Sequence, residues 1–158
     1  MIRQLALAAL VVGTLDIGEV ILFLWLRGVA PPMRVVQGVA AGLLGKSTFQ
    51  GGIRTALLGL AIHFFIATMV VLVYHFASRR IAVLRRSPVI MGVFYGLLVY
   101  AFMYGVVLPL SAAGPPKFNW PYWLNGPFAH VFCVGIPTGL LARQSIALSE
   151  QRESNGPT

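Results

Sequence analysis

Four long apolar stretches alternate with shorter segments that carry most of the polar residues. A helix needs about 20 apolar residues to cross the hydrocarbon core of a membrane. Four stretches reach this length, and they cover residues 5–26, 55–76, 89–110 and 124–142. The pattern therefore predicts an all-α, polytopic membrane protein built as a four-helix transmembrane bundle. Residues 1–145 are expected to form its single transmembrane domain, and residues 146–158 a polar cytoplasmic tail.

The composition of the chain supports the same class. Of the 158 residues, 58% are hydrophobic and 10% are charged, whereas soluble domains contain about 45–50% apolar and about 25% charged residues. These fractions exclude a water-soluble globule and a disordered chain. The single cysteine, Cys133, excludes an intrachain disulfide and any metal site built from several cysteines.

Basic residues dominate the charge, with 12 Lys and Arg against 4 Asp and Glu. In a membrane protein this excess is typical of loops that lie against phospholipid head groups, so the expected partner is the lipid bilayer and not nucleic acid. We expect six basic residues to contact lipid phosphates: Lys46, Arg54, Arg79, Arg80, Arg85 and Arg86.

The linkers between the stretches predict an orientation. The 77–88 linker carries four arginines, and basic loops between spans face the cytoplasm, which with four spans makes both termini cytoplasmic. The 27–54 linker opposes this orientation, because it also carries four basic residues yet lies on the other side. Its stretch 35–45 is apolar and glycine-rich but too short to span a bilayer, which indicates a short interfacial or re-entrant segment between the first two spans.

Two pairs of glycines are spaced for close packing of helices. Gly92 and Gly96 lie four residues apart in the third stretch, and Gly135 and Gly139 repeat this spacing in the fourth. Lipid provides no hydrophobic drive for helix association, so small residues that let backbones approach are common at helix contacts. The spacing indicates a tight helix pair, a homodimer face, or the ordinary packing of a bundle. Pro137 is expected to kink the fourth span.

Two of the four acidic residues lie inside the first span. Asp16 is near its middle, and Glu19 follows three residues later on the same helix face. A charged side chain at a helix centre costs about 2.5–3.5 kcal/mol on insertion scales, so such residues face a bundle interior or a water-filled cavity. The two acids are therefore candidates for a functional site, and the alternative is a structural hydrogen-bonded pair.

Polar residues of the other spans fall at a similar depth. With a rise of about 1.5 Å per residue, one residue of each span lies about 9–12 Å from the same side of the membrane. These residues are Glu19, His63, Tyr104 and His130. Together with Asp16, they are predicted to form one buried polar site.

The chemistry of this site has several interpretations. A carboxylate beside a histidine allows a proton to be exchanged. Glu19, His63 and His130 also suit a divalent metal, because imidazole nitrogen and carboxylate oxygen are ligands of zinc, iron and manganese. The two histidines suit the axial ligation of a haem iron. The alternative is that each histidine is a hydrogen-bonded packing residue. His75, at the inner end of the second span, is explained by an interfacial position.

The order of motifs in residues 88–143 resembles a known family. A glycine-rich span ends in Val107-Leu108-Pro109-Leu110, and after it come Gly114-Pro115-Pro116, the aromatic loop 118–123 and a span that contains Phe128-Ala129-His130. This order is similar to that of the YagU-type bacterial inner-membrane proteins, a family without an established biochemical activity. The resemblance implies a bacterial inner-membrane location and a histidine at the position of His130. The glutamate that precedes this histidine in the family is absent, because residues 126–129 are Gly-Pro-Phe-Ala.

Three functions are compatible with these features. The first is a small membrane protein that handles protons, ions or a small solute through the buried acid and histidine layer. The second is a structural or accessory subunit of a larger membrane complex, packed through its glycine faces. The third is a haem- or metal-binding subunit. No motif specifies a nucleophile or another catalytic residue, so an enzyme is not expected, and a homo-oligomer would be needed to complete a transport pathway.

Overall fold

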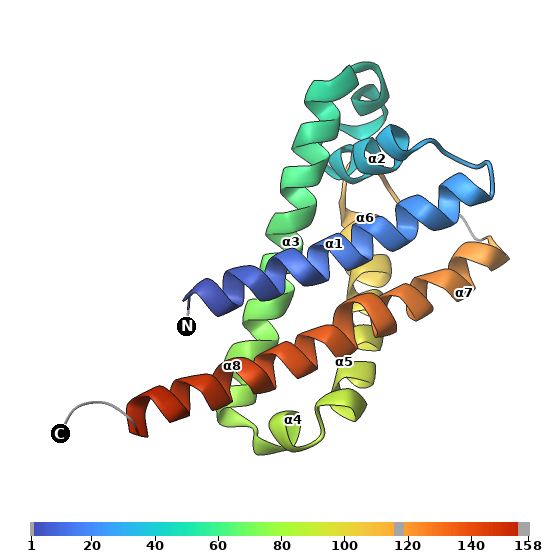
Figure 1. Ribbon diagram of the computed structural model, residues 1–158. Coiled ribbons are helices and arrows are strands. Elements are labelled where there is room, and N and C mark those ends of the chain that lie inside the picture. Colours follow the sequence, from blue (N-terminus) through green and yellow to red (C-terminus); the bar gives the residue numbers. More distant parts are fainter. Residues whose placement is uncertain (1, 116–118, 155–158) are drawn as a thin grey trace.

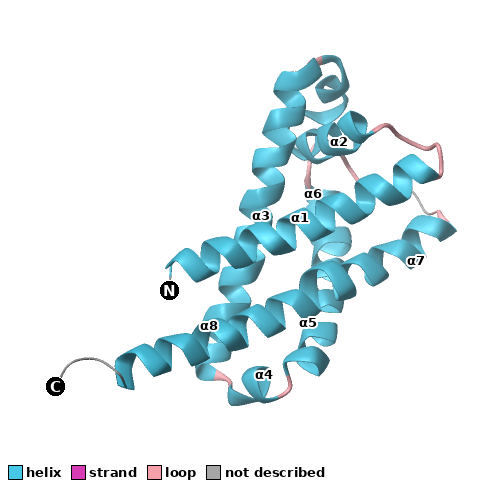
Figure 2. Cartoon of the chain, viewed as in Figure 1, coloured by secondary structure: helices cyan, strands magenta, loops and turns pink. Residues whose placement is uncertain are grey.

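The computed structural model describes residues 2–115 and 119–154 of the chain. These residues are mostly helical, and none of them forms a β-strand (Figure 2). Four helical segments are long and apolar enough to span a membrane: Ile2–Leu26, Gly52–Arg80, Pro88–Leu110 and Trp123–Gln151. The predicted all-α fold with four spans is confirmed, and the protein is a multi-pass membrane protein.

The first and fourth spans run side by side in opposite directions (Figure 1). The first span is helix α1 (Ile2–Leu26). The fourth consists of α7 (Trp120–Ala129), a π-helical turn η3 (His130–Gly135) and α8 (Ile136–Ser154). α1 contacts all three parts of the fourth span, so the two ends of the described chain lie in one layer of the bundle.

The second and third spans cross this layer at an angle (Figure 1). The second span is α3 (Gly52–Arg80), which packs against α1 and α8. The third begins as α5 (Pro88–Phe102), which packs against η3 and α8, and continues through a π-helical turn η2 (Met103–Val107) into α6 (Leu108–Leu110). The polar residues inside the bundle therefore lie where the two layers cross.

Both π-helical turns lie just before a proline. Pro109 follows η2 and Pro137 follows η3. A proline inside a helix has no N–H to donate, and its ring collides with the carbonyl four residues earlier. A π-helical turn at this place relieves the collision by adding one residue to the turn. The interruption predicted at Pro137 therefore takes the form of a wider turn, and the same happens at Pro109.

The 27–54 linker is a folded helical cap and not an open loop. It contains α2 (Pro32–Leu44) and the 3₁₀ helix η1 (Gly45–Gln50), and α2 packs against α3 and α1. Gln37 is buried and donates from Nε2 to the carbonyl of Gly52 at 2.9 Å and to Oγ1 of Thr55 at 3.2 Å. Thr55 donates in turn to the carbonyl of Thr48 at 2.7 Å. These bonds hold the cap against the start of α3.

The cap and the chain ends lie at opposite ends of the molecule. The turn helix α4 (Ala82–Arg86) lies at the same end as the N-terminus and the end of α8, while α2 lies at the other (Figure 1). Two contacts between distant parts of the chain fix the first end: Ser145 donates to Oε1 of Gln4 at 3.1 Å, and Arg85 pairs with Glu150 at 3.8 Å. The cytoplasmic location of this end stays a prediction.

Helices extend further than the apolar stretches predict. α3 continues to Arg80, inside the predicted 77–88 linker. α8 continues to Ser154, so most of the predicted 146–158 tail is a helix, and residues 155–158 lie outside the described part. Ser145 and Ile146 are buried against the rest of the bundle. Because most residues of this segment are polar, the sequence did not predict that these two positions continue the packed face of α8.

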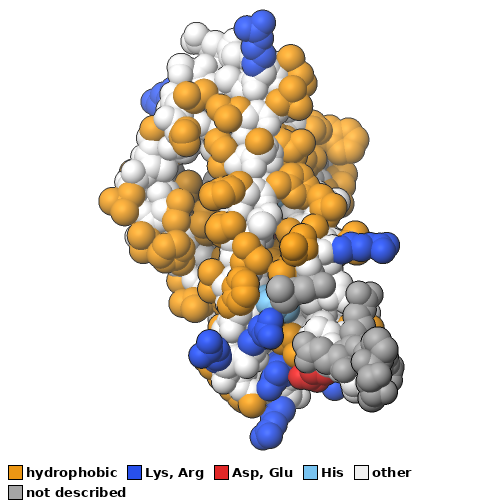
Figure 3. Space-filling model, turned by 90° about the vertical axis from the view of Figure 1, so that its left-hand side faces the viewer, with side chains coloured by type: hydrophobic (Ala, Val, Ile, Leu, Met, Phe, Trp, Pro, Cys, Tyr) orange, Lys and Arg blue, Asp and Glu red, His pale blue; other side chains and the backbone are white. Residues whose placement is uncertain are grey.

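The surface has the distribution expected of a membrane protein. Figure 3 shows one face on which hydrophobic side chains cover most of the middle, while Lys and Arg side chains gather toward the lower end, with others at the top. Large apolar side chains on all four spans are more than half exposed, including Leu10 at 55%, Phe65 at 63%, Leu98 at 63% and Phe128 at 55%. Lipid tails are the medium in which this exposure carries no cost.

Candidate functional site

The third and fourth spans meet backbone to backbone, and this contact positions the start of η3. A Cβ atom on Gly92 would lie 2.8 Å from the carbonyl oxygen of Gly135, and one on Gly96 would meet the carbonyl oxygen of His130. A Cβ on Gly139 would collide with the carbonyl of Pro88. The four predicted glycines thus form a tight helix pair within the chain. Their faces are covered by this contact and are not exposed to a second copy or a partner subunit.

One cavity lies where the two layers cross. Its volume is about 110 Å³, and three polar side chains from three different spans line it: Asp16 of α1, His63 of α3 and His130 of η3. The rest of its wall is apolar: Val12, Val39, Ile66, Ala67, Val70, Val99, Met103 and Val134. The structure therefore brings together three of the five residues of the predicted layer. Val39 belongs to α2, so the helical cap forms part of the wall.

His63 is held by the first span. Its Nε2 lies 2.8 Å from the carbonyl oxygen of Gly13, and the residue is 9% exposed. A carbonyl oxygen only accepts hydrogen bonds, so Nε2 carries the proton and, in a neutral ring, Nδ1 keeps its lone pair. Glycine at position 13 lets α1 come this close to α3, because a Cβ there would lie 2.7 Å from the ring of Phe64.

His130 is held by its own helix. Its Nδ1 lies 2.9 Å from the carbonyl oxygen of Gly126, one turn earlier. By the same argument Nδ1 carries the proton, and Nε2 of a neutral ring is the acceptor. Two tyrosine rings flank it, with centroids 5.5 Å away for Tyr100 and 6.4 Å away for Tyr104. The two histidines are thus fixed in opposite tautomers.

Glu19 has a different environment from Asp16. Glu19 does not line the cavity, and its Oε2 accepts a hydrogen bond of 3.2 Å from Nδ2 of Asn125 on α7. Asn125 is a polar residue of the site that the sequence analysis missed, although an amide at the second position of an apolar span is a signal. Tyr104 also stays outside the cavity wall, but it lies close enough to both carboxyls to interact with them electrostatically.

The residues that the structure describes do not form the predicted metal site. Among residues 2–115 and 119–154, no three His, Cys, Asp or Glu side chains are grouped as ligands of one metal ion. The set of Glu19, His63 and His130 fails because Glu19 lies apart from the cavity that the two histidines line. The cavity of about 110 Å³ is also far smaller than the roughly 300–1,000 Å³ of pockets for drug-sized ligands, so a haem does not fit between the histidines.

The basic residues predicted to contact lipid lie at both ends of the molecule. Lys46 is exposed in η1 and Arg54 is exposed in the first turn of α3. Arg79, Arg80 and Arg86 are exposed at the opposite end. Arg85 differs, because its guanidinium pairs with Glu150 of α8. Contact of these residues with lipid phosphates stays a prediction.

His75 is buried among the helices. It is 2% exposed, and neither ring nitrogen has a hydrogen-bond partner among the described residues. α3 presents it on the buried face of the helix, and α3 packs there against α1 and α8. α8 continues as a helix beyond the apolar stretch and covers this end of α3, so His75 is buried, and its interfacial depth stays a prediction.

No protein-family model, curated protein or solved structure matches this chain. The resemblance of residues 88–143 to the YagU-type family therefore stays a prediction, and the function is argued from the cavity alone.

Proposed function

We propose that this membrane protein handles protons, and that Asp16, His63 and His130 carry them through the cavity between the spans. The observation that supports this most is the meeting of one carboxyl and two imidazoles from three spans around a single cavity in the bundle. Ionisable residues inside a membrane span are costly, and they mark ion pathways and proton relays.

The tautomers of the two histidine rings suit proton exchange. The carbonyls of Gly13 and Gly126 fix one nitrogen of each ring as a donor, so Nδ1 of His63 and Nε2 of His130 are free to accept a proton. The carboxyl of Asp16 lines the same cavity and is a third group that can hold a proton.

The size of the cavity favours protons over a solute. A volume of about 110 Å³ holds roughly three or four waters, since one water occupies about 30 Å³ in the liquid. Waters hydrogen-bonded to Asp16 and the two rings would bridge the distances between them. An apolar wall around such waters confines the proton to the three polar groups.

Proton flux into proteoliposomes tests the proposal. We would enclose a pH-sensitive dye, apply an acid jump and clamp the membrane potential with potassium and valinomycin. Flux above that of protein-free vesicles is expected for the wild type, and Asp16→Asn and His63→Gln should each reduce it to the protein-free level. Thr68→Val is the matched control, because Thr68 lies on α3 outside the cavity wall and donates only to the carbonyl of Phe64 in its own helix. A wild type no faster than empty vesicles would refute the function.

We also propose that the protein lies in a bacterial inner membrane with its termini in the cytoplasm. Three exposed arginines, Arg79, Arg80 and Arg86, lie at the end that carries the termini, as basic loops do on the cytoplasmic side. The test uses single cysteines at Ser87 or Ser47 in a variant without Cys133. An impermeant thiol reagent should label Ser47→Cys in intact cells and Ser87→Cys only in inverted vesicles. Labelling of Ser87→Cys from outside intact cells would reverse the orientation.

A further inference from the structure

The buried face of α3 carries a second histidine beyond the cavity. His63, Ala67, Val71 and His75 follow one another at intervals of four residues, and all four are buried. With a rise of about 1.5 Å per residue, the two histidines are separated by about 18 Å along the helix. His63 lines the cavity, and His75 lies toward the end that carries α4 and the chain termini.

An apolar cluster separates the two histidines. Ala8, Val12, Val71 and Val134 pack together, each less than a tenth exposed. Val12 and Val134 also form part of the cavity wall, so the cluster borders the cavity on one side. His75 comes one helical turn after Val71, on the other side of it. The arrangement is that of two polar positions on either side of an apolar constriction, as in channels that gate by excluding water.

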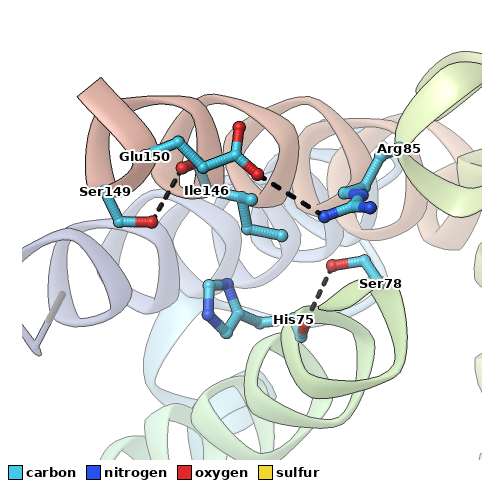
Figure 4. A network of polar contacts seen from close by, with 6 residues as sticks. All are labelled: His75, Ser78, Arg85, Ile146, Ser149 and Glu150. Atoms are coloured by element: carbon cyan, nitrogen blue, oxygen red, sulfur yellow. Dashed lines mark hydrogen bonds and ion pairs between the residues drawn. The ribbon is translucent and has the colours of Figure 1, made fainter. Parts of the chain in front are cut away.

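The surroundings of His75 leave its ring unsatisfied. Figure 4 shows the ring between α3 and α8, while its backbone carbonyl accepts the hydroxyl of Ser78 at 2.7 Å. Both ring nitrogens lack a partner among the described residues, and so does Oγ1 of Thr138, which is 1% exposed on α8. A buried polar group without a partner destabilises the fold, and a phenyl ring in the same place would avoid this cost.

Charged groups lie near His75. The ion pair between Arg85 of α4 and Glu150 of α8 is seen in the same close-up as the ring, and its side chains are 35% and 67% exposed (Figure 4). Tyr74, the neighbour of His75, donates to the carbonyl of Leu84 at 3.1 Å, which ties this part of α3 to the segment before the ion pair. His75 thus lies between the apolar cluster and an exposed charged surface.

We propose that His75 is a second proton-carrying residue, which transfers protons between the cavity and the end of the protein that carries α4 and the termini. The inference rests on the proposed function. In each transfer the unprotonated ring nitrogen gains a proton, and the other ring nitrogen then releases one on the opposite side. Rotation of the ring then turns the unprotonated nitrogen back toward the side that supplies protons, and no bond other than N–H is made or broken. Brief hydration of the apolar cluster connects the cavity to the ring.

Proton flux in proteoliposomes tests this with two replacements of His75. His75→Phe fills the space without a titratable group, and His75→Gln keeps hydrogen-bonding capacity without carrying a proton. Each is expected to reduce flux at least tenfold while the protein stays folded, and His75→Phe should unfold at the wild-type temperature or above it. Phe76→Leu is the matched control, because Phe76 is the next residue and is 54% exposed.

A second measurement separates this inference from the proposed function. In His75→Phe, ¹⁵N spectra of His63 and His130 should still show proton uptake, because the cavity itself is intact. Wild-type flux that is lost in Asp16→Asn but stays within twofold in either folded His75 variant would overturn the role of His75 alone. A wild type without flux would overturn both proposals. If neither variant folds, ¹⁵N spectra of the wild type decide: a His75 ring fixed in one tautomer without proton exchange would overturn the inference.

Discussion

Replacing Gly135 by alanine should separate the third and fourth spans. A Cβ atom at this position would lie 2.6 Å from the amide nitrogen of Gly96 and 2.8 Å from its Cα, and it would also collide with the carbonyl oxygen of Gly92. All three neighbours are backbone atoms, so no side chain can rotate away. The helices must move apart, and over-packing of this kind costs typically about 1–3 kcal/mol.

Gly105→Ala is the matched control for this variant. Gly105 lies in the π-helical turn η2, as Gly135 lies in η3, and a Cβ there would have no neighbour within 4 Å. Alanine gains roughly 0.5–1 kcal/mol over glycine in a helix at either position. This gain cancels in the comparison, so the two variants should differ by the over-packing cost alone. We expect the upper part of that range, about 2–3 kcal/mol.

Unfolding by SDS in mixed micelles, followed by circular dichroism, measures this difference. A double-mutant cycle with Gly92→Ala sharpens it. Each of the two glycines opposes the other's carbonyl, so the first replacement already opens the contact and the second should cost less than it does alone. Equal stability of Gly135→Ala and Gly105→Ala, or strict additivity with Gly92→Ala, would refute the reasoning.

Three further predictions concern polar contacts. Gln37→Leu should destabilise the cap by about 1–3 kcal/mol and speed hydrogen exchange in α2, because it removes two buried hydrogen bonds; exchange as slow as in the exposed control Gln50→Leu would contradict this. Arg85→Ala should change the unfolding free energy by less than about 1 kcal/mol, since its ion pair is exposed, and a larger loss in SDS titration would show that the pair does more. Asn125→Leu should cost about 1.5–3 kcal/mol by depriving the carboxyl of Glu19 of its donor, and adding Glu19→Leu should recover most of that loss; a double variant as unstable as the single one would argue against the contact.

The fold could be predicted because span length is a strong constraint. A membrane-spanning segment must hydrogen-bond every backbone polar group internally and cover about 30 Å of hydrocarbon, so the spans could be located as long apolar stretches of the sequence. The ends of the helices could not be predicted in this way. Residues 143–154 contain many polar letters, yet Ser145 and Ile146 are buried and continue the packed face of α8. Two inward positions among these twelve residues are too weak a signal to see among polar neighbours.

For the candidate site, only the depth of each residue in the membrane could be predicted from the sequence. Residue counts placed His63 and His130 in one layer with Glu19, and Asp16 nearly one helical turn deeper; the structure shows His63, His130 and Asp16 lining one cavity. Direction around the helix axis was not available from counting. Glu19 follows Asp16 by three residues, which turns its side chain by roughly 60° relative to Asp16, and it binds Asn125 instead of lining the cavity. The burial of His75 could not be predicted for the same reason, since it depends on which helix covers that face of α3.

The glycine contact and the candidate site are parts of one structure. A Cβ on Gly96 would meet the carbonyl oxygen of His130 and lie 2.8 Å from the Cα of Val131, so the backbone that carries the His130 ring rests directly on α5. Any change that widens this contact moves one wall of the cavity and leaves Asp16 and His63 on the other two helices where they were. Glycine variants should therefore lose stability and proton flux together. His75→Phe should lose flux alone, because removal of an unsatisfied buried ring costs the fold nothing. The pattern of joint and separate losses thus distinguishes the residues that build the cavity from a residue that only carries protons through the bundle.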